Sequence, residues 1–202
     1  MKMKKYLFLA LGAVLCFAVG CSDASAPDLV TGKIEMEDGG VIEFELYPDV
    51  APQSVKNFVH LAREGFYDGL RFHRIMSGFM IQGGCPDSSG GGGPGYSILG
   101  EFEANGIENN ISHTRGVLSM ARSNDFNSAG SQFFICHGDP QFLDGSYAAF
   151  GRVTEGMDVV DRIADETPTV DGERVSLRNM PIIKTISIDG DFAMDEPNKL
   201  PR

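Results

Sequence analysis

The stretch Phe72-His73-Arg74-Ile75-Met76-Ser77-Gly78-Phe79-Met80-Ile81-Gln82-Gly83-Gly84 decides how this chain is interpreted. It predicts two short strands joined by a turn at Ser77-Gly78. Because side chains alternate between the two faces of a strand, Met80 and Gln82 share one face of the second strand. With Arg74 on the first strand, a cation, an amide and several apolar groups converge on a small area. Taken alone, the stretch is also compatible with a half-buried hairpin that carries a surface arginine.

Two further segments argue against a simple hairpin with a surface arginine. Residues 130–136 are Gly-Ser-Gln-Phe-Phe-Ile-Cys, and residues 142–151 begin with Phe-Leu-Asp-Gly and end with Tyr-Ala-Ala-Phe-Gly. Together, F-H-R-I-x-x-G-F-M-I-Q-G-G, S-Q-F-F-I-C and L-D-G-x-x-x-x-F-G closely resemble motifs of the cyclophilin family of peptidyl-prolyl isomerases. The three motifs occur in the family's order, and the resemblance covers about residues 30–189.

Length and composition fit one domain of ordinary size with short appendages. The chain has 202 residues, of which 42% are hydrophobic, and this is enough to build a core. Its formal net charge is −11, and without residues 1–20, which hold three lysines and no acid, it becomes −14. Nucleic-acid binding proteins usually carry basic surfaces, so the composition argues against a nucleic-acid partner.

The first twenty residues predict a secretory signal peptide. A basic start precedes an apolar run from Tyr6 to Val19, which is too short for a membrane-spanning helix. Ala18-Val19-Gly20-Cys21 resembles the cleavage box of a bacterial lipoprotein, whose cysteine thiol receives a diacylglycerol. Two or more acyl chains hold a protein on a membrane stably. We therefore expect a signal over 1–20, a tether over 21–29, a lipid on Cys21 and a secreted protein anchored to a bacterial cell-envelope membrane. The alternative is an ordinary signal with an incidental cysteine.

The periodicity of the remaining chain predicts a mainly β domain over residues 30–190 and a flexible tail over 191–202. Helical spacing occurs only within 48–65, where Ser54 is the expected cap, and within 156–164. The expected strands cover 30–36, 41–47, 72–82, 96–103, 116–122, 131–136, 147–153 and 181–188. The resemblance implies a closed eight-stranded antiparallel β-barrel capped by two α-helices, one over each end.

The activity that the resemblance implies is rotation about the peptide bond before proline. This rotation has a barrier of about 20 kcal/mol because it breaks amide resonance. In the twisted state the prolyl nitrogen regains a lone pair and can accept a hydrogen bond. A guanidinium suits this acceptor because it stays protonated and offers several N–H donors. By resemblance Arg74 is the catalytic residue, in a noncovalent mechanism for which we expect neither a cofactor nor a metal.

The prolyl ring requires a small apolar pocket, and the same residues would otherwise be assigned to the core. By resemblance, the pocket positions are Phe79, Met80, Phe134 and Leu143.

The peptide backbone requires polar partners beside that pocket. By resemblance, Gln82 and Gln132 hydrogen-bond the substrate backbone, and Gln82 also orients Arg74. The backbone at Ala121 and Arg122 pairs with an extended peptide.

Two more substrate-binding positions depart from the family's common pattern. Tyr147 stands where many members carry histidine, and Phe142 stands where many carry tryptophan. These departures affect the expected ligand preference and leave the arginine and the pocket in place.

The sequence therefore predicts a monomeric peptidyl-prolyl isomerase that assists the folding of exported or envelope proteins. Its partners are proline-containing peptides and unfolded client proteins. The alternative is a noncatalytic module that binds such peptides as a chaperone or surface interaction domain, for which Arg74 is not needed. The run from Gly90 to Gly95 formally fits a dinucleotide-binding fingerprint, but Pro94 and Gly95 prevent the helix that such a site requires. Cys85 and Cys136 could pair in an oxidising envelope, but two free buried thiols are the default expectation.

Overall fold

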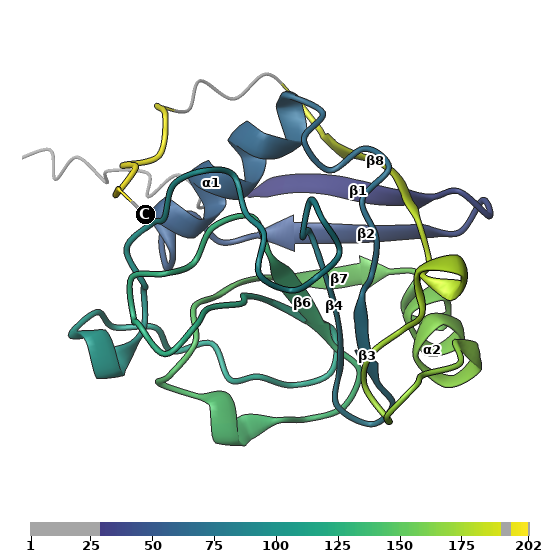
Figure 1. Ribbon diagram of the computed structural model, residues 1–202. Coiled ribbons are helices and arrows are strands. Elements are labelled where there is room, and N and C mark those ends of the chain that lie inside the picture. Colours follow the sequence, from purple (N-terminus) through teal and green to yellow (C-terminus); the bar gives the residue numbers. More distant parts are fainter. Residues whose placement is uncertain (1–28, 191–194, 202) are drawn as a thin grey trace, which may run out of the picture.

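A computed structural model describes residues 29–190 and 195–201, so the predicted signal peptide and Cys21 lie outside the described residues. Within them, eight strands and two α-helices form the domain (Figure 1). The strands are β1 (Val30–Met36), β2 (Val41–Leu46), β3 (Arg74–Met76), β4 (Met80–Gly83), β5 (Val117–Met120), β6 (Phe133–Cys136), β7 (Ala149–Glu155) and β8 (Ile183–Ile188). The helices are α1 (Pro52–Arg63) and α2 (Met157–Glu166), and short 3₁₀ turns occupy Glu103–Asn105, Gln141–Leu143 and Leu177–Asn179.

All eight strands belong to one curled antiparallel sheet with the order β3-β4-β6-β5-β7-β2-β1-β8. The mainly β architecture predicted from the sequence is therefore confirmed. A fully closed barrel is not, because β3 and β8 are the two edges of the sheet. Backbone hydrogen bonds still join the segment just before β3 to the start of β8. Phe72 N donates to Pro181 O at 3.0 Å, and Ile183 N donates to Leu70 O at 2.8 Å.

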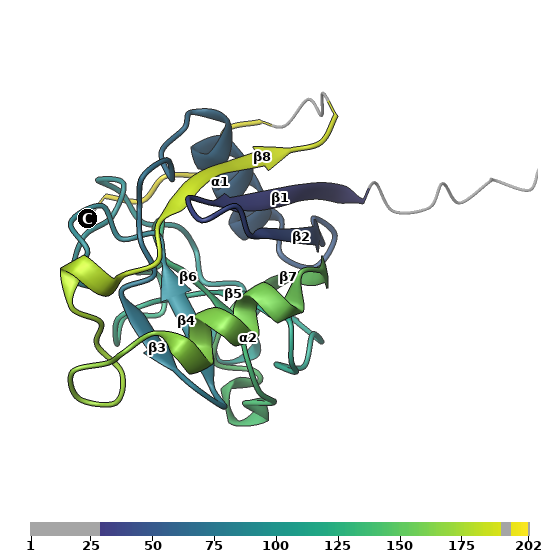
Figure 2. The ribbon, with the colours of Figure 1, turned by 90° about the vertical axis from the view of Figure 1, so that its right-hand side faces the viewer.

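The two helices pack on different parts of this sheet. Helix α1 lies along β8, and α2 lies near β2, β3 and β4 (Figure 2). Phe58 of α1 is fully buried and places its ring 5.7 Å from that of Phe44 and 5.2 Å from that of Phe133, both edge-on. Such edge-to-face pairs add to the stabilisation from apolar burial. Helix α1 is therefore anchored by an aromatic cluster in the core.

The start of α1 is capped by a residue far away in sequence. Ser54 lies inside the helix, so its predicted role as the cap residue was wrong. The carboxylate of Glu101 accepts hydrogen bonds from the backbone N–H groups of Gln53 and Ser54, each at 2.8 Å, and from the Ser54 hydroxyl at 2.7 Å. Glu101 is only 2% exposed, and burial raises the pKa of its carboxyl group. These bonds satisfy donors that every helix start leaves unpaired.

The segment that carries Glu101 is not a strand, so the predicted strand over 96–103 was wrong. Its backbone makes only isolated bridges, which pair Ser97 with Leu200 and Ile98 with Ala129. The alternation of apolar residues in this segment suggested a strand. The segment is instead shaped by the bond from Glu101 to the helix and by the 3₁₀ turn that follows.

Part of the predicted flexible tail lies against the domain. The N–H of Ser97 donates to the Leu200 carbonyl at 3.0 Å, and the N–H of Leu200 donates to the Ser97 carbonyl at 2.8 Å. Asn198 N donates to the side chain of Gln53 at 2.8 Å, and Pro197 is buried. Residues 195–201 therefore form part of the wall of the domain.

The two cysteines within the described residues are free and buried, as the sequence predicts. The thiol of Cys85 donates to Asp87 at 2.9 Å. Burial raises the pKa of the Cys136 thiol to about 12. Because the thiolate is the reactive form, Cys136 is an inert core residue.

We expect Glu101→Ala to lower the free energy of unfolding by about 2–3 kcal/mol, because it leaves buried helix N–H groups without an acceptor. Urea denaturation of the domain measures this loss. Glu103→Ala is the matched control, since Glu103 is an exposed acid two residues away. Equal denaturation midpoints for the two variants would show that the cap contributes nothing.

Candidate active site

A cavity of about 120 Å³ opens on the face of the sheet formed by β3, β4 and β6. Nine of the eleven substrate-site residues predicted from the sequence line it, and they come from segments up to 73 positions apart. They are Arg74, Phe79, Met80, Gln82, Ala121, Arg122, Phe134, Leu143 and Tyr147. The cavity has the size of a small apolar ring, and two cations, Arg74 and Arg122, border it.

Strand register brings the central residues together. Arg74 of β3 is directly opposite Gln82 of β4, and Gln82 is directly opposite Phe134 of β6. Residues directly opposite each other in antiparallel strands point to the same face. The cation, the amide and the aromatic ring therefore form a row across three strands.

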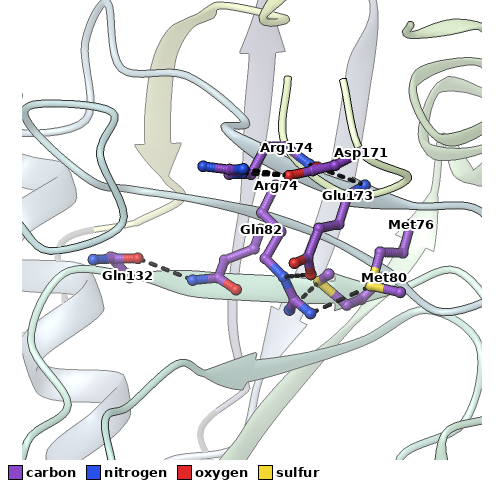
Figure 3. A network of polar contacts seen from close by, with 8 residues as sticks. All are labelled: Arg74, Met76, Met80, Gln82, Gln132, Asp171, Glu173 and Arg174. Carbon is purple, nitrogen blue, oxygen red and sulfur yellow. Dashed lines mark hydrogen bonds and ion pairs between the residues drawn. The ribbon is translucent and has the colours of Figure 1, made fainter. Parts of the chain in front are cut away.

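The guanidinium of Arg74 has one strong partner and two weak ones (Figure 3). Its Nε donates to Oε2 of Glu173 at 2.8 Å. Its terminal nitrogens face the thioether sulfurs of Met80 at 3.9 Å and Met76 at 3.3 Å. Its Cζ lies 5.8 Å from the centre of the Phe79 ring. A thioether is a weak acceptor, so the terminal N–H groups remain available to a better one.

The sequence assigned the orientation of Arg74 to Gln82, but the contacts differ. Nε2 of Gln82 donates to Oε1 of Gln132 at 2.9 Å, and Glu173 holds the arginine instead (Figure 3). Glu173 was missed because it lies outside all three motifs, in the loop between α2 and β8. No periodicity or spacing in the sequence relates it to Arg74.

Phe134 forms the floor of the cavity and is 4% exposed. Its ring stacks on His113 at a centroid distance of 6.0 Å, and the edge-on ring of Tyr147 also lies 6.0 Å away. Nδ1 of His113 lies 2.9 Å from Asp144, and Nε2 lies 3.0 Å from the Ser119 hydroxyl. These polar partners fix the imidazole that supports the floor.

The order Ser119, His113, Asp144 resembles the connectivity of a hydrolytic triad. Ser119 has 0% exposure, however, and is directly opposite Phe134 in the pairing of β5 with β6, so a substrate cannot reach its hydroxyl. Burial lowers the pKa of His113, while Asp144 acts in the opposite direction. The three residues therefore support the pocket structurally, and nucleophilic chemistry at Ser119 is excluded by burial.

Arg122 is held between aromatic rings at the side of the cavity. Its Cζ lies 4.5 Å from the ring centre of Tyr147, 5.0 Å from that of Phe126 and 5.1 Å from that of Phe102. Its Nε and Nη2 donate to the Ser146 carbonyl at 3.0 and 2.8 Å. The side chain of Arg122 is thus a fixed cation in the wall, a role that the expected backbone pairing did not include.

A second hollow, of about 410 Å³, continues from the first and shares Gln82, Ala121 and Arg122 with it. Gln132 lines this hollow, and its Nε2 donates to the carbonyls of Gly90 and Gly92, each at 2.9 Å. The predicted backbone partner Gln132 therefore also anchors the glycine-rich loop. Pro201 of the C-terminal segment completes the wall.

Phe142 is the predicted site residue that lies furthest from the cavity interior. Its side chain is 76% exposed, and its ring is tilted against that of Phe79 at 5.6 Å. It forms the rim beside the pocket and is not among the residues that line either hollow.

Known proteins resemble this chain over most of the domain. The family described as "Cyclophilin type peptidyl-prolyl cis-trans isomerase/CLD" matches residues 31–187. The chain is 49% identical over 135 residues to peptidyl-prolyl cis-trans isomerase B of Bacillus subtilis, covering 67% of this chain and 91% of that protein. It is 38% identical over 192 residues to a peptidyl-prolyl cis-trans isomerase of Acinetobacter baylyi, covering 92% and 95%.

A solved structure is similar over most of the domain. It is the crystal structure of a Cryptosporidium parvum cyclophilin type peptidyl-prolyl cis-trans isomerase in the presence of the dipeptide Ala-Pro. Its TM-score is 0.70 and its sequence identity 30%, and the match covers 80% of this chain and 99% of that one.

Phe134→Leu should weaken the binding of an Ala-Pro peptide severalfold, because it removes the aromatic floor, and should cost about 1–2 kcal/mol of stability. Phe133→Leu is the matched control, since Phe133 is fully buried and packs in the core on the opposite face of β6. It should cost similar stability and leave affinity unchanged. Peptide titration and thermal unfolding of both variants check this, and equal affinities would remove Phe134 from the pocket.

Proposed function

The chain belongs to the cyclophilin-type peptidyl-prolyl cis-trans isomerase family and is an enzyme of that type, and we propose that Arg74 is its catalytic group. The observation that carries this proposal is the row of Arg74, Gln82 and Phe134 across three strands. It sets a guanidinium at the edge of an apolar cavity of prolyl size. The reaction breaks no covalent bond, so a donor and a pocket are sufficient.

In the proposed mechanism, the prolyl ring lies in the cavity on Phe134 and beside Met80. The terminal N–H groups of Arg74 leave their thioether contacts and donate to the prolyl nitrogen when the amide is twisted. Resonance occupies the nitrogen lone pair in both planar isomers, so this hydrogen bond forms fully only in the transition state. An interaction that is stronger in the transition state than in the ground state accelerates the reaction. The apolar wall around Arg74 strengthens it by lowering the local dielectric constant.

The rest of the peptide is proposed to extend from the cavity into the second hollow. Ala121 lies between the two hollows, and its N–H is already paired with the Gln132 carbonyl at 3.0 Å. Peptide pairing at this position therefore uses the Ala121 carbonyl as an acceptor. The amide of Gln82 borders the same path and suits the carbonyl and N–H groups of an extended backbone. Gln132 already donates its N–H groups to Gly90 and Gly92, so its side chain offers the peptide its Oε1 as an acceptor.

We propose that the substrates are proline-containing segments of unfolded proteins. We also propose that the enzyme is a monomer and that it assists the folding of exported or envelope proteins. The Ala-Pro dipeptide named for the Cryptosporidium structure supports the ligand class. The N-terminal sequence supports the compartment, because its basic start, apolar run and small residues before Cys21 have the form of a lipoprotein signal. Within residues 29–190 and 195–201, no helix is long and apolar enough to cross a membrane.

We expect Arg74→Ala to lower kcat/KM by at least about a hundredfold, since removing one well-placed transition-state donor typically costs this much. Its melting temperature should stay close to that of the wild type, because the side chain is one-third exposed. A protease-coupled assay on an Ala-Pro peptide measures the rate. Near wild-type turnover by a folded Arg74→Ala domain would reject the mechanism.

The proposed lipid anchor depends on Cys21. Cys21→Ser should move the full-length protein from the membrane fraction to the soluble fraction or leave its signal uncleaved, because serine carries no thiol to acylate. Cell fractionation with mass measurement of the mature N-terminus checks both outcomes. Unchanged fractionation, with cleavage mapped to another position, would rule out lipid on Cys21.

A further inference from the structure

Glu173 contacts the proposed catalytic guanidinium although it lies in no recognised motif. Its Oε2 is 2.8 Å from Nε of Arg74. The side chains of Arg74 and Glu173 are 33% and 41% exposed, so the pair sits at the edge of the cavity, neither buried nor fully in solvent. The two residues are 99 positions apart in the chain.

Backbone hydrogen bonds to β3 fix the position of Glu173. The N–H of Ile75 donates to the Glu173 carbonyl at 2.7 Å, and the N–H of Val175 donates to the His73 carbonyl at 3.1 Å. An isolated bridge also pairs Arg74 with Arg174. Residues 173–175 therefore run antiparallel beside the edge strand β3, directly next to the arginine.

The loop that carries Glu173 is closed by its own contacts. The N–H of Val170 donates to the Arg174 carbonyl at 2.7 Å. The carboxylate of Asp171 accepts from the backbone N–H of Arg174 at 2.9 Å and from its Nε at 2.6 Å (Figure 3). Because Asp171 is engaged by Arg174 within the loop, Glu173 is the loop acid that faces Arg74.

The contact at Nε determines how the rest of the guanidinium lies. The group is planar and rigid, so one strong hydrogen bond at Nε restricts the directions of its terminal N–H groups. These groups then point toward the sulfurs of Met76 and Met80, and Met80 is one of the residues that line the cavity. One edge of the guanidinium is thus held by a carboxylate, while among the described residues the other edge faces only weak acceptors.

We propose that Glu173 is a positioning residue, which orients Arg74 toward the prolyl nitrogen by accepting the Nε hydrogen bond. The inference rests on the proposed role of Arg74. The negative charge of Glu173 would by itself weaken the attraction of Arg74 for an electron-rich nitrogen. Solvent screens that charge effect at partly exposed groups, whereas the orientation of a planar donor is not screened. Orientation is therefore the larger effect.

Comparing Glu173→Ala with Glu173→Gln separates orientation from charge. Both changes remove the charge, but only alanine removes the acceptor, since glutamine retains a carbonyl oxygen. Glu173→Ala should lower kcat about tenfold, which corresponds to about 1.4 kcal/mol of transition-state stabilisation. Its KM should stay within about twofold, because Glu173 is not among the residues that line the cavity. Glu173→Gln should keep at least about half of the wild-type kcat, given the retained acceptor.

Other results of this comparison would overturn the proposal. Equal losses of kcat in the two variants would assign the effect to charge. A wild-type kcat in Glu173→Ala would show that the contact with Arg74 does not contribute to catalysis. A change confined to KM would assign Glu173 to substrate binding.

Arg174→Ala is the matched control from the same loop. Its side chain is 74% exposed and pairs with Asp171, not with the catalytic pair. It should keep wild-type kcat and KM, and all variants should melt near the wild-type temperature. A loss in Arg174→Ala equal to that in Glu173→Ala would overturn the proposal, because loop folding and not the contact would then be responsible.

The double variant Arg74→Ala/Glu173→Ala distinguishes failure of this inference from failure of the proposed mechanism. If Glu173 acts through Arg74, its removal should cause no further loss once Arg74 is absent. An additional tenfold loss would show that Glu173 acts elsewhere. Wild-type turnover by Arg74→Ala alone would reject the role of Arg74 itself. Inactive Arg74→Ala together with fully active Glu173→Ala would reject only the positioning role.

Discussion

The pairing register of β3, β4 and β6 is the constraint on which both the core and the site depend. It aligns Ile75, Ile81 and Ile135, all fully buried, on the core side of the sheet. On the other side it aligns Arg74 with the residues that border the cavity. A slip of one residue would move every side chain to the opposite face, burying the cation and exposing the isoleucines. The cost of exposing the core therefore maintains the geometry of the site.

Beneath the cavity, rigidity comes from polar groups that are buried and satisfied. His113 and Ser119 have no exposed surface, yet each is hydrogen-bonded, and the imidazole lies flat under Phe134. A buried polar group is costly when unpaired, so such a network tolerates few arrangements. The pocket floor is thus restricted from below by hydrogen bonds and from the side by the ring of Tyr147.

The sequence could predict those parts of the site that lie on strands. Met80, Gln82 and Phe134 were assigned to the site by resemblance to the family motifs, and alternation placed Met80 and Gln82 on one face; the structure brings all three to one cavity. Glu101 and Glu173 were missed because each acts through a loop contact, 47 and 99 positions away in the chain, that leaves no local pattern. Alternation also gave one wrong prediction. The segment 96–103 has the spacing of a strand, but it is not part of the sheet, and its Glu101 caps a helix instead.

Replacing Phe142 with tryptophan would give this protein a fluorescent probe of ligand binding. The chain contains no tryptophan, so its intrinsic fluorescence comes from tyrosine and phenylalanine alone. An indole placed at this exposed rim position, against Phe79 and beside the prolyl cavity, would be the sole long-wavelength emitter. A peptide covering the rim would move that indole from water into an apolar contact and shift its emission to shorter wavelength. Ligand binding could then be followed directly, with no coupled protease and no label on the peptide.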